Sequence, residues 1–247
     1  SAPAAALVAL ADRLDSLVGC FAVGLSPSGG ADPYGLRRAC LGVLRTLLDQ
    51  RFDLGLSAAI AAAYAGYAGV ELDLDEPTLV GKLLGFFRDR LRGLLGAEMA
   101  TDAVDAALGV GADRPLDARA RAAALHELDE PTRRSLGEVF KRATNIAKTA
   151  PEGEPERGPE AAEQALHDAF LPLRAELASL AAAGDYALAF AELAALAPLL
   201  QSYFEQVFVM AEDETLRSNR LRLMRIISDS CGALGRLELL GEVSEGG

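Results

Sequence analysis

The stretch VMAEDETLRSNRLRLM, Val209 to Met224, begins with acidic residues and then places three arginines and an asparagine within an apolar pattern. A helix turns by about 100° per residue, so residues three, four and seven apart share a face. The centre of one face is then apolar: Leu216, Leu223 and Ile227. The pattern predicts an amphipathic helix, which we expect to belong to one long helix from residue 201 to about residue 240.

Asn219 and Arg220 fall on the two shoulders of that apolar face, where partly buried polar groups need partners. One interpretation is an internal network. In it, Asp213 pairs with Arg217 at i+4, and Glu212 or Asp213 is the hydrogen-bond partner on the side of Asn219 and Arg220. We expect this structural role. The alternative is that Arg220 contacts RNA directly.

The rest of the chain shows the same spacing of apolar residues, and alternating β-branched runs are nearly absent. This predicts an all-α protein. The segment ELDLDEP interrupts the pattern, and Pro77 after Asp75 and Glu76 is typical of a helix start. We therefore expect two helical domains, residues 1–77 and 78–247. The acidic, proline-rich segment PEGEPERGPEAAE predicts a loop between helices.

Composition excludes several functional classes for the 247-residue chain. The formal net charge of −12 argues against a general nucleic-acid coat, DNA binding or an acidic-membrane binder, although a local basic face stays compatible with it. Three scattered cysteines and two histidines form no metal-ligand spacing and fit a cytoplasmic protein without a metal. The longest uncharged run, Leu54 to Val70, is shorter than the roughly 20 residues of a membrane span.

A polar stripe runs along the helix expected over Leu136 to Lys148. Lys141, Asn145 and Lys148 share one side, Arg142 lies beside them, and the apolar residues fall opposite. An ordinary solvated face explains this stripe. A strip that contacts RNA explains it as well, because Lys and Arg hold phosphates and Asn can bind a base edge.

Five collinear segments carry a resemblance to a known family. FEQVFVMAEDETLRSNRLRLMRII, residues 204–227, resembles the closing helix of the DALR-type anticodon-binding domain of arginyl-tRNA synthetases. It is more similar still to β subunits of the bacterial tetrameric glycyl-tRNA synthetases. FFRDRLRGLL, and VDAALGVGADRPLDARARAAAL followed by VFKRATNIAK, resemble the first helices of that domain. LADRLDSLVGCFAVGLSPSG and DPYGLRRACLGVLRTLL resemble the segment before it. The Ala143-Thr144 pair departs from the family, which more often has Val beside a bulkier residue.

The resemblance implies that the chain corresponds to the C-terminal part of that subunit. Residues 1–77 would be the C-terminal portion of an HD-like helical domain, and residues 78–247 a DALR-like helical bundle. Asp12 looks like the last aspartate of an HD-type metal phosphohydrolase site. One carboxylate holds a metal weakly, so we expect a structural Asp12, no bound metal and no phosphohydrolase activity.

The function implied by the resemblance is recognition of glycine tRNA, whose anticodons end in two cytosines. In this family the α subunit of the α2β2 heterotetramer holds the adenylating site, which uses ATP and Mg²⁺. We expect no catalytic residue and no cofactor in this chain. The candidate tRNA contacts are Arg88, Arg90, Lys141, Arg142, Asn145 and Arg220. Two alternatives remain, a helical subunit-interaction module with an Ala-rich face over residues 58–69 and a hydrolase remnant around Asp12.

Overall fold

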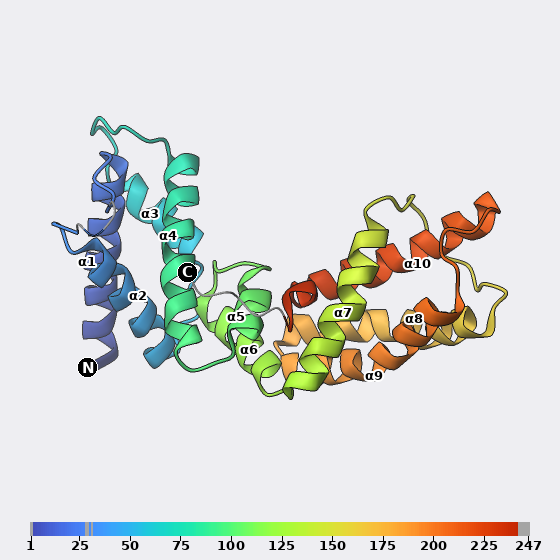
Figure 1. Cartoon of the computed structure of the whole chain (residues 1–247). Coiled ribbons are helices and arrows are strands. Elements are labelled where there is room, and N and C mark those ends of the chain that lie inside the picture. The colour runs from blue at the N-terminus through green and yellow to red at the C-terminus, as the bar shows by residue number, and fades with distance from the viewer. Residues whose placement is uncertain (1, 28–29, 31, 242–247) are drawn as a thin grey trace. The chain divides into compact units, whose positions relative to one another are not determined.

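The computed structural model describes residues 2–27, 30 and 32–241, and Figure 1 shows the whole chain. Within these residues the chain forms ten α-helices and one short 3-10 helix, and no β-strand. This confirms the all-α prediction. The helices form two compact units, residues 1–98 with 111–119 and residues 99–110 with 120–247. Each unit is described by itself.

Four helices build the first unit: α1 (Ala2–Ala22), α2 (Leu36–Gln50), α3 (Leu56–Ala65) and α4 (Glu76–Gly96). α1 packs against the other three, and α4 packs against α2 and α3. The core between them is aliphatic and aromatic, and it includes Val18, Leu44, Ile60 and Phe87, all fully buried. Burial of such side chains is the main force that holds helices together.

α4 begins where the sequence predicts a helix start. The Asp75 carboxylate accepts a hydrogen bond from the Thr78 backbone N–H at 3.1 Å, and Pro77 occupies the first turn. Its buried residues recur every fourth position: Leu79, Leu83, Phe87, Leu91 and Leu95. Because this stripe packs onto α2 and α3, α4 belongs to the first unit. The expected boundary after residue 77 therefore falls at the start of this helix, whereas the compact unit continues to residue 98.

The second unit holds α5 (Thr101–Leu108), α7 (Glu130–Ala147), α8 (Ala161–Ala183), α9 (Tyr186–Gln206), α10 (Glu214–Gly232) and the 3-10 helix η1 (Leu237–Leu239). α6 (Pro115–His126) starts in the first unit and ends in the second. α8 and α9 form a hairpin closed by Gly184 at φ +75°, a left-handed conformation that favours glycine. α7 packs against α9, α10 and η1, and Figure 1 shows α7 crossing α10.

α9 is long and apolar enough to cross a membrane by length and composition alone. Its apolar residues instead fill the centre of the second unit, where Phe190, Leu193, Leu200 and Tyr203 are fully buried. A helix that is apolar on most sides is typical of a bundle core.

The prediction of one helix from residue 201 to about residue 240 is wrong. Residues 201–206 end α9, Val207 is extended, and α10 starts only at Glu214. The Asp213 carboxylate accepts from the Leu216 backbone N–H at 2.9 Å and so caps α10. Acidic residues at this point stabilise a helix N-terminus, so the acidic run marks a helix boundary.

Candidate nucleic-acid interface

α7 carries the predicted polar stripe, and its first turn is built as the sequence suggests. The Asp129 carboxylate accepts from the Thr132 backbone N–H at 2.7 Å, and Pro131 lies in the first turn. The hydrogen bonds from Thr132 lower the pKa of Asp129 below its usual value. One face of α7 is buried, through Leu136, Gly137, Val139, Phe140 and Ala143. The opposite face is therefore turned to solvent.

That exposed face gathers three of the six predicted contact residues. Lys141, Arg142 and Asn145 line one open surface depression together with Glu138 and Ile146. Lys141, Arg142 and Asn145 are all exposed. The structure thus brings together a lysine, an arginine and an amide on one helix, which can hold a phosphate backbone and bind a base edge.

Arg142 and Asn145 are held by contacts within the second unit. The Arg142 guanidinium lies over the Phe204 ring of α9, 4.3 Å from its centroid. Such cation–π contacts hold a guanidinium in place while it keeps its charge. The Asn145 Oδ1 accepts from Lys148 Nζ at 2.8 Å, so Lys148 joins the same polar face. Phe204 is 5% exposed and gives Arg142 a rigid support from a second helix.

Arg88 and Arg90 lie on α4, in the first unit. Arg88 is exposed. Arg90 is held by its own helix, because its Nη1 donates to the Phe86 carbonyl at 3.1 Å and its guanidinium lies over the Phe86 ring, 3.6 Å from the ring centroid. Of the two residues, Arg88 has the side chain that is presented to solvent.

Arg220 is buried, with 3% of its side chain exposed, so the prediction of an RNA contact does not fit its position. Its guanidinium pairs with Glu163 at 3.2 Å and Glu160 at 2.5 Å, and it donates to the Phe208 carbonyl at 2.9 Å. Glu163 is 1% exposed. Both carboxylates come from the start of α8 and the residue before it, and neither comes from the acidic run before α10.

Asn219 ties the proline-rich loop to α10. Its Oδ1 accepts from the Glu156 backbone N–H at 2.6 Å, and its Nδ2 donates to the Glu156 carbonyl at 2.8 Å. Arg222 adds a bond from Nε to the Glu152 carbonyl at 3.0 Å. The expected structural role of Asn219 and Arg220 is therefore confirmed, with other partners than expected. Arg217 bonds to the Ala211 carbonyl, and Asp213 serves as a helix cap.

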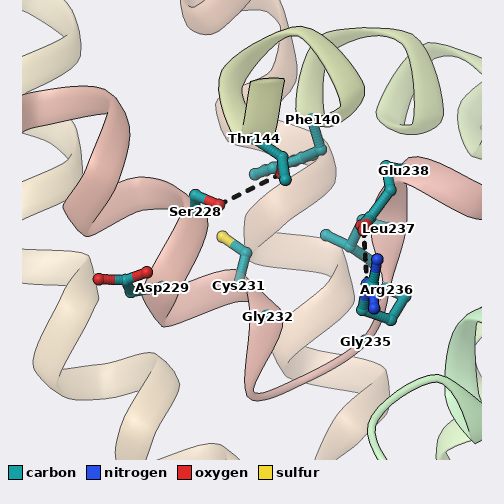
Figure 2. Close-up of a pocket in the computed structure, with 10 residues that line it drawn as sticks. All are labelled: Phe140, Thr144, Ser228, Asp229, Cys231, Gly232, Gly235, Arg236, Leu237 and Glu238. Carbon is teal, nitrogen blue, oxygen red and sulfur yellow. Dashed lines mark hydrogen bonds and ion pairs between the residues drawn. The ribbon is translucent and has the colours of Figure 1, made fainter. Parts of the chain in front are cut away.

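A cavity that no sequence pattern predicts lies between the end of α7, the end of α10 and η1 (Figure 2). It has a volume of about 330 Å³, and its lining comprises Phe140, Thr144, Ser228, Asp229, Cys231, Gly232, Gly235, Arg236, Leu237 and Glu238. The Ser228 hydroxyl donates to Thr144 Oγ1 at 3.2 Å, and Arg236 Nε lies 2.5 Å from Glu238 Oε1. No periodicity marks residues 235–238, because they lie in a loop and a 3-10 helix.

Asp12 is exposed on α1. Among the residues that the structure describes, no three His, Cys, Asp or Glu side chains lie close enough together to hold a metal ion. The three cysteines are free thiols, and Cys40 and Cys231 are buried. Burial raises the pKa of the Cys40 thiol to about 12, which leaves it protonated and unreactive at neutral pH.

Comparison with known proteins gives two family matches along the chain. A family described as "Glycyl-tRNA synthetase beta subunit" matches residues 1–109, and "DALR anticodon binding domain" matches residues 136–237. The second match covers α7 from Leu136 onward, which includes its polar face. The β subunit of glycine–tRNA ligase from Geobacter metallireducens is 39% identical over 232 residues, which are 93% of this chain and 34% of that protein.

Two further relatives agree. The β subunits of glycine–tRNA ligase from Myxococcus xanthus and Desulforamulus reducens are each 37% identical, over 89% and 90% of this chain and 33% of their own lengths. The chain thus spans about a third of the length of the curated relatives it matches. With both family matches in the expected order, the chain belongs to the family of glycyl-tRNA synthetase β subunits and includes its DALR anticodon-binding domain.

Proposed function

We propose that this chain recognises the anticodon hairpin of glycine tRNA and so supports glycyl-tRNA synthesis, with the exposed face of α7 as its main RNA contact. The observation that carries the proposal is the gathering of Lys141, Arg142 and Asn145 around one surface depression, within the segment that matches the DALR domain. Loops of RNA suit this kind of contact because their unpaired bases expose their edges.

The three side chains would bind different parts of the RNA. Lys141 and Arg142 supply positive charge for phosphates, and the support of Arg142 by Phe204 fixes where that charge lies. Asn145 presents an amide, which can donate and accept toward a base edge. Arg88 remains a candidate second contact from the first unit.

The partner proposed for this chain is the α subunit of the same synthetase, in a heterotetramer located in the cytoplasm. In that assembly ATP and Mg²⁺ would act at the α subunit, while this chain would contribute RNA binding without a catalytic residue or cofactor of its own. We propose no membrane or DNA partner. The net charge of −12 disfavours general binding to an anionic membrane or to DNA, whereas the proposed tRNA contact depends on the local charge of α7.

The test is a double substitution, Lys141→Ala with Arg142→Ala, measured as affinity for a glycine anticodon hairpin across a series of salt concentrations. Each lost phosphate contact lowers the slope of log K against log salt by roughly 0.7–0.9. We therefore expect weaker binding and a slope smaller by about one to two. The control is Arg157→Ala with Arg174→Ala, which removes the same charge from two exposed arginines of the same unit that lie outside α7.

Three outcomes would contradict the proposal. Unchanged affinity and slope in the Lys141 and Arg142 variant would remove α7 from the interface. An equal loss in the control variant would show that only total charge matters. A chain that binds no tRNA would favour the helical subunit-interaction module.

A further inference from the structure

The cavity shown in Figure 2 has a polar wall that combines a carboxylate with a guanidinium. Arg236 and Glu238 lie side by side there, and their ion pair uses Arg236 Nε and one oxygen of Glu238. The terminal N–H groups of the guanidinium and the second carboxylate oxygen can still face a ligand. The side chains of Arg236 and Glu238 are 52% and 17% exposed, so the pair lies at the mouth of the cavity.

This arrangement matches one pyrimidine better than the other. Cytosine presents an N4 amino donor beside the acceptors N3 and O2, and carboxylates accept from cytosine N4 while guanidinium groups donate to base acceptors. Uracil would bring its O4 acceptor against the Glu238 carboxylate and its N3–H donor against Arg236. Both contacts are unfavourable, so the pair can distinguish the two bases.

Size and shape also suit a single base. The cavity volume of about 330 Å³ lies at the lower end of the roughly 300–1,000 Å³ typical of small-ligand sites. Phe140 and Leu237 supply apolar surface for the face of a ring, while the hydroxyls of Thr144 and Ser228 lie at one side (Figure 2). A planar ring with one polar edge can therefore enter with that edge against Arg236 and Glu238.

The cavity adjoins the RNA-binding face proposed for α7. Thr144, which lines the cavity, lies three residues after Lys141 and four before Lys148. Residues at these spacings are neighbours on the helix surface. An RNA loop whose phosphates contact Lys141 and Lys148 would therefore lie beside the mouth of the cavity.

We propose that this cavity receives one unpaired cytosine of the anticodon loop, with Glu238 accepting from its N4 amino group and Arg236 donating to N3 and O2. The inference rests on the proposed function and adds to it the site of base discrimination. In this arrangement α7 supplies affinity for any hairpin, and the Arg236–Glu238 pair supplies preference for cytosine.

The test compares hairpins in which each of the two final anticodon cytosines is replaced in turn by uracil, at about 0.15 M salt. Two hydrogen bonds to the edge of one base discriminate against the wrong base by roughly tenfold or more. The wild-type chain should therefore bind the cytosine hairpin more tightly than the uracil hairpin by that factor at one position. Glu238→Gln should reduce this preference to about threefold or less, because an amide can serve either base. Arg236→Gln should weaken binding of the cytosine hairpin.

The matched control is Glu176→Gln, which makes the same chemical change at an exposed position of α8. It should keep the full preference for cytosine. Because a variant at Glu238 could also disturb folding, its melting temperature is measured in parallel. A second measurement needs no variant: a photoreactive 5-bromocytidine at the discriminated position should crosslink to residues 228–238 of the wild-type chain.

The outcomes separate the inference from the proposed function. If Glu238→Gln keeps the wild-type preference, or the crosslink falls outside the cavity, the inference is overturned while the role of α7 stands. If the wild-type chain binds cytosine and uracil hairpins equally, the inference fails even where Lys141 and Arg142 still prove necessary for affinity. Loss of affinity for every hairpin in the α7 variant, with preference intact, supports both.

Discussion

Arg220 shows how a single buried charge can hold three segments of the second unit together. Its guanidinium joins α10 to Glu163 of α8, to Glu160 just before α8 and to the Phe208 carbonyl between α9 and α10. A guanidinium suits this position because its planar N–H groups can bind several acceptors at once. Its chemistry is therefore used inside the protein, although arginine is also a common RNA contact.

We predict that Arg220→Met destabilises the chain by about 3–5 kcal/mol, because it leaves the buried carboxylate of Glu163 without its partner. Urea unfolding followed by circular dichroism measures this change. Arg225→Ala on the same helix is the control. Its pair with Asp229 spans 3.6 Å with the Asp229 side chain 70% exposed, so its removal should cost less than about 1 kcal/mol.

A double substitution sharpens the test. Glu163→Met combined with Arg220→Met removes both charges, and exchanging a buried ion pair for apolar side chains is often neutral or stabilising. The double variant should therefore be more stable than Arg220→Met alone. A single variant as stable as the wild type would show that the ion pair contributes nothing to folding.

At the level of helices, sequence patterns predicted the elements better than their partners. The buried face of α7 and the exposed stripe of Lys141 and Asn145 follow directly from the spacing of apolar residues. The loop partner of Asn219 and the carboxylate partners of Arg220 lie 57 to 63 residues away in sequence. Helical projection compares residues within one helix, so it cannot find a partner on another.

The cavity beside α7 could not be predicted from the sequence for a similar reason. Its wall at residues 235–238 follows the end of α10 and has neither helical nor strand spacing, so no pattern points to it. The acidic run before α10 fits the face of a longer helix, but in the structure it marks the N-terminus of α10. Acidic residues support both interpretations until the position of the helix start is known.

Gly137 sets how closely η1 and its C-terminal neighbour pack against α7. A Cβ atom at this position would lie 2.0 Å from the Leu240 carbonyl oxygen, which belongs to backbone and cannot move alone. We predict that Gly137→Ala costs about 1–3 kcal/mol, as overpacking in a core does. It should also weaken the preference for cytosine, because the displaced segment carries Arg236 and Glu238. Thermal unfolding and hairpin binding measure the two effects.

The control for the stability effect of Gly137→Ala is Gly232→Ala, at the last residue of α10; because Gly232 lines the cavity, the two variants are compared by thermal unfolding only. A Cβ there meets no atom within 4 Å, so the methyl group should be tolerated. If Gly137→Ala were as stable as Gly232→Ala, the close packing of Leu240 on α7 would be contradicted.

For the molecule as a whole, charge presents an apparent conflict with RNA binding. The chain carries 36 acidic and 24 basic side chains, yet its proposed ligand is a polyanion. The conflict disappears when charge is considered locally, because RNA contacts act over a Debye length of roughly 8 Å at physiological salt. Acidic residues elsewhere then repel RNA only weakly, and they reduce binding at sites other than the face of α7.

This view predicts the effect of removing negative charge away from α7. Glu127 and Glu176 are exposed residues of the second unit. Replacing both with Gln should raise affinity for any RNA hairpin by about two- to threefold at roughly 10 mM salt, where the Debye length is near 30 Å. The gain should vanish by about 0.15 M salt, and the preference for cytosine should stay unchanged throughout, because neither residue lines the cavity. An increase in affinity that persists at 0.15 M salt, or one confined to the cytosine hairpin, would mean that these carboxylates act at the binding site itself. Long-range charge and local recognition would then not be separate effects in this protein.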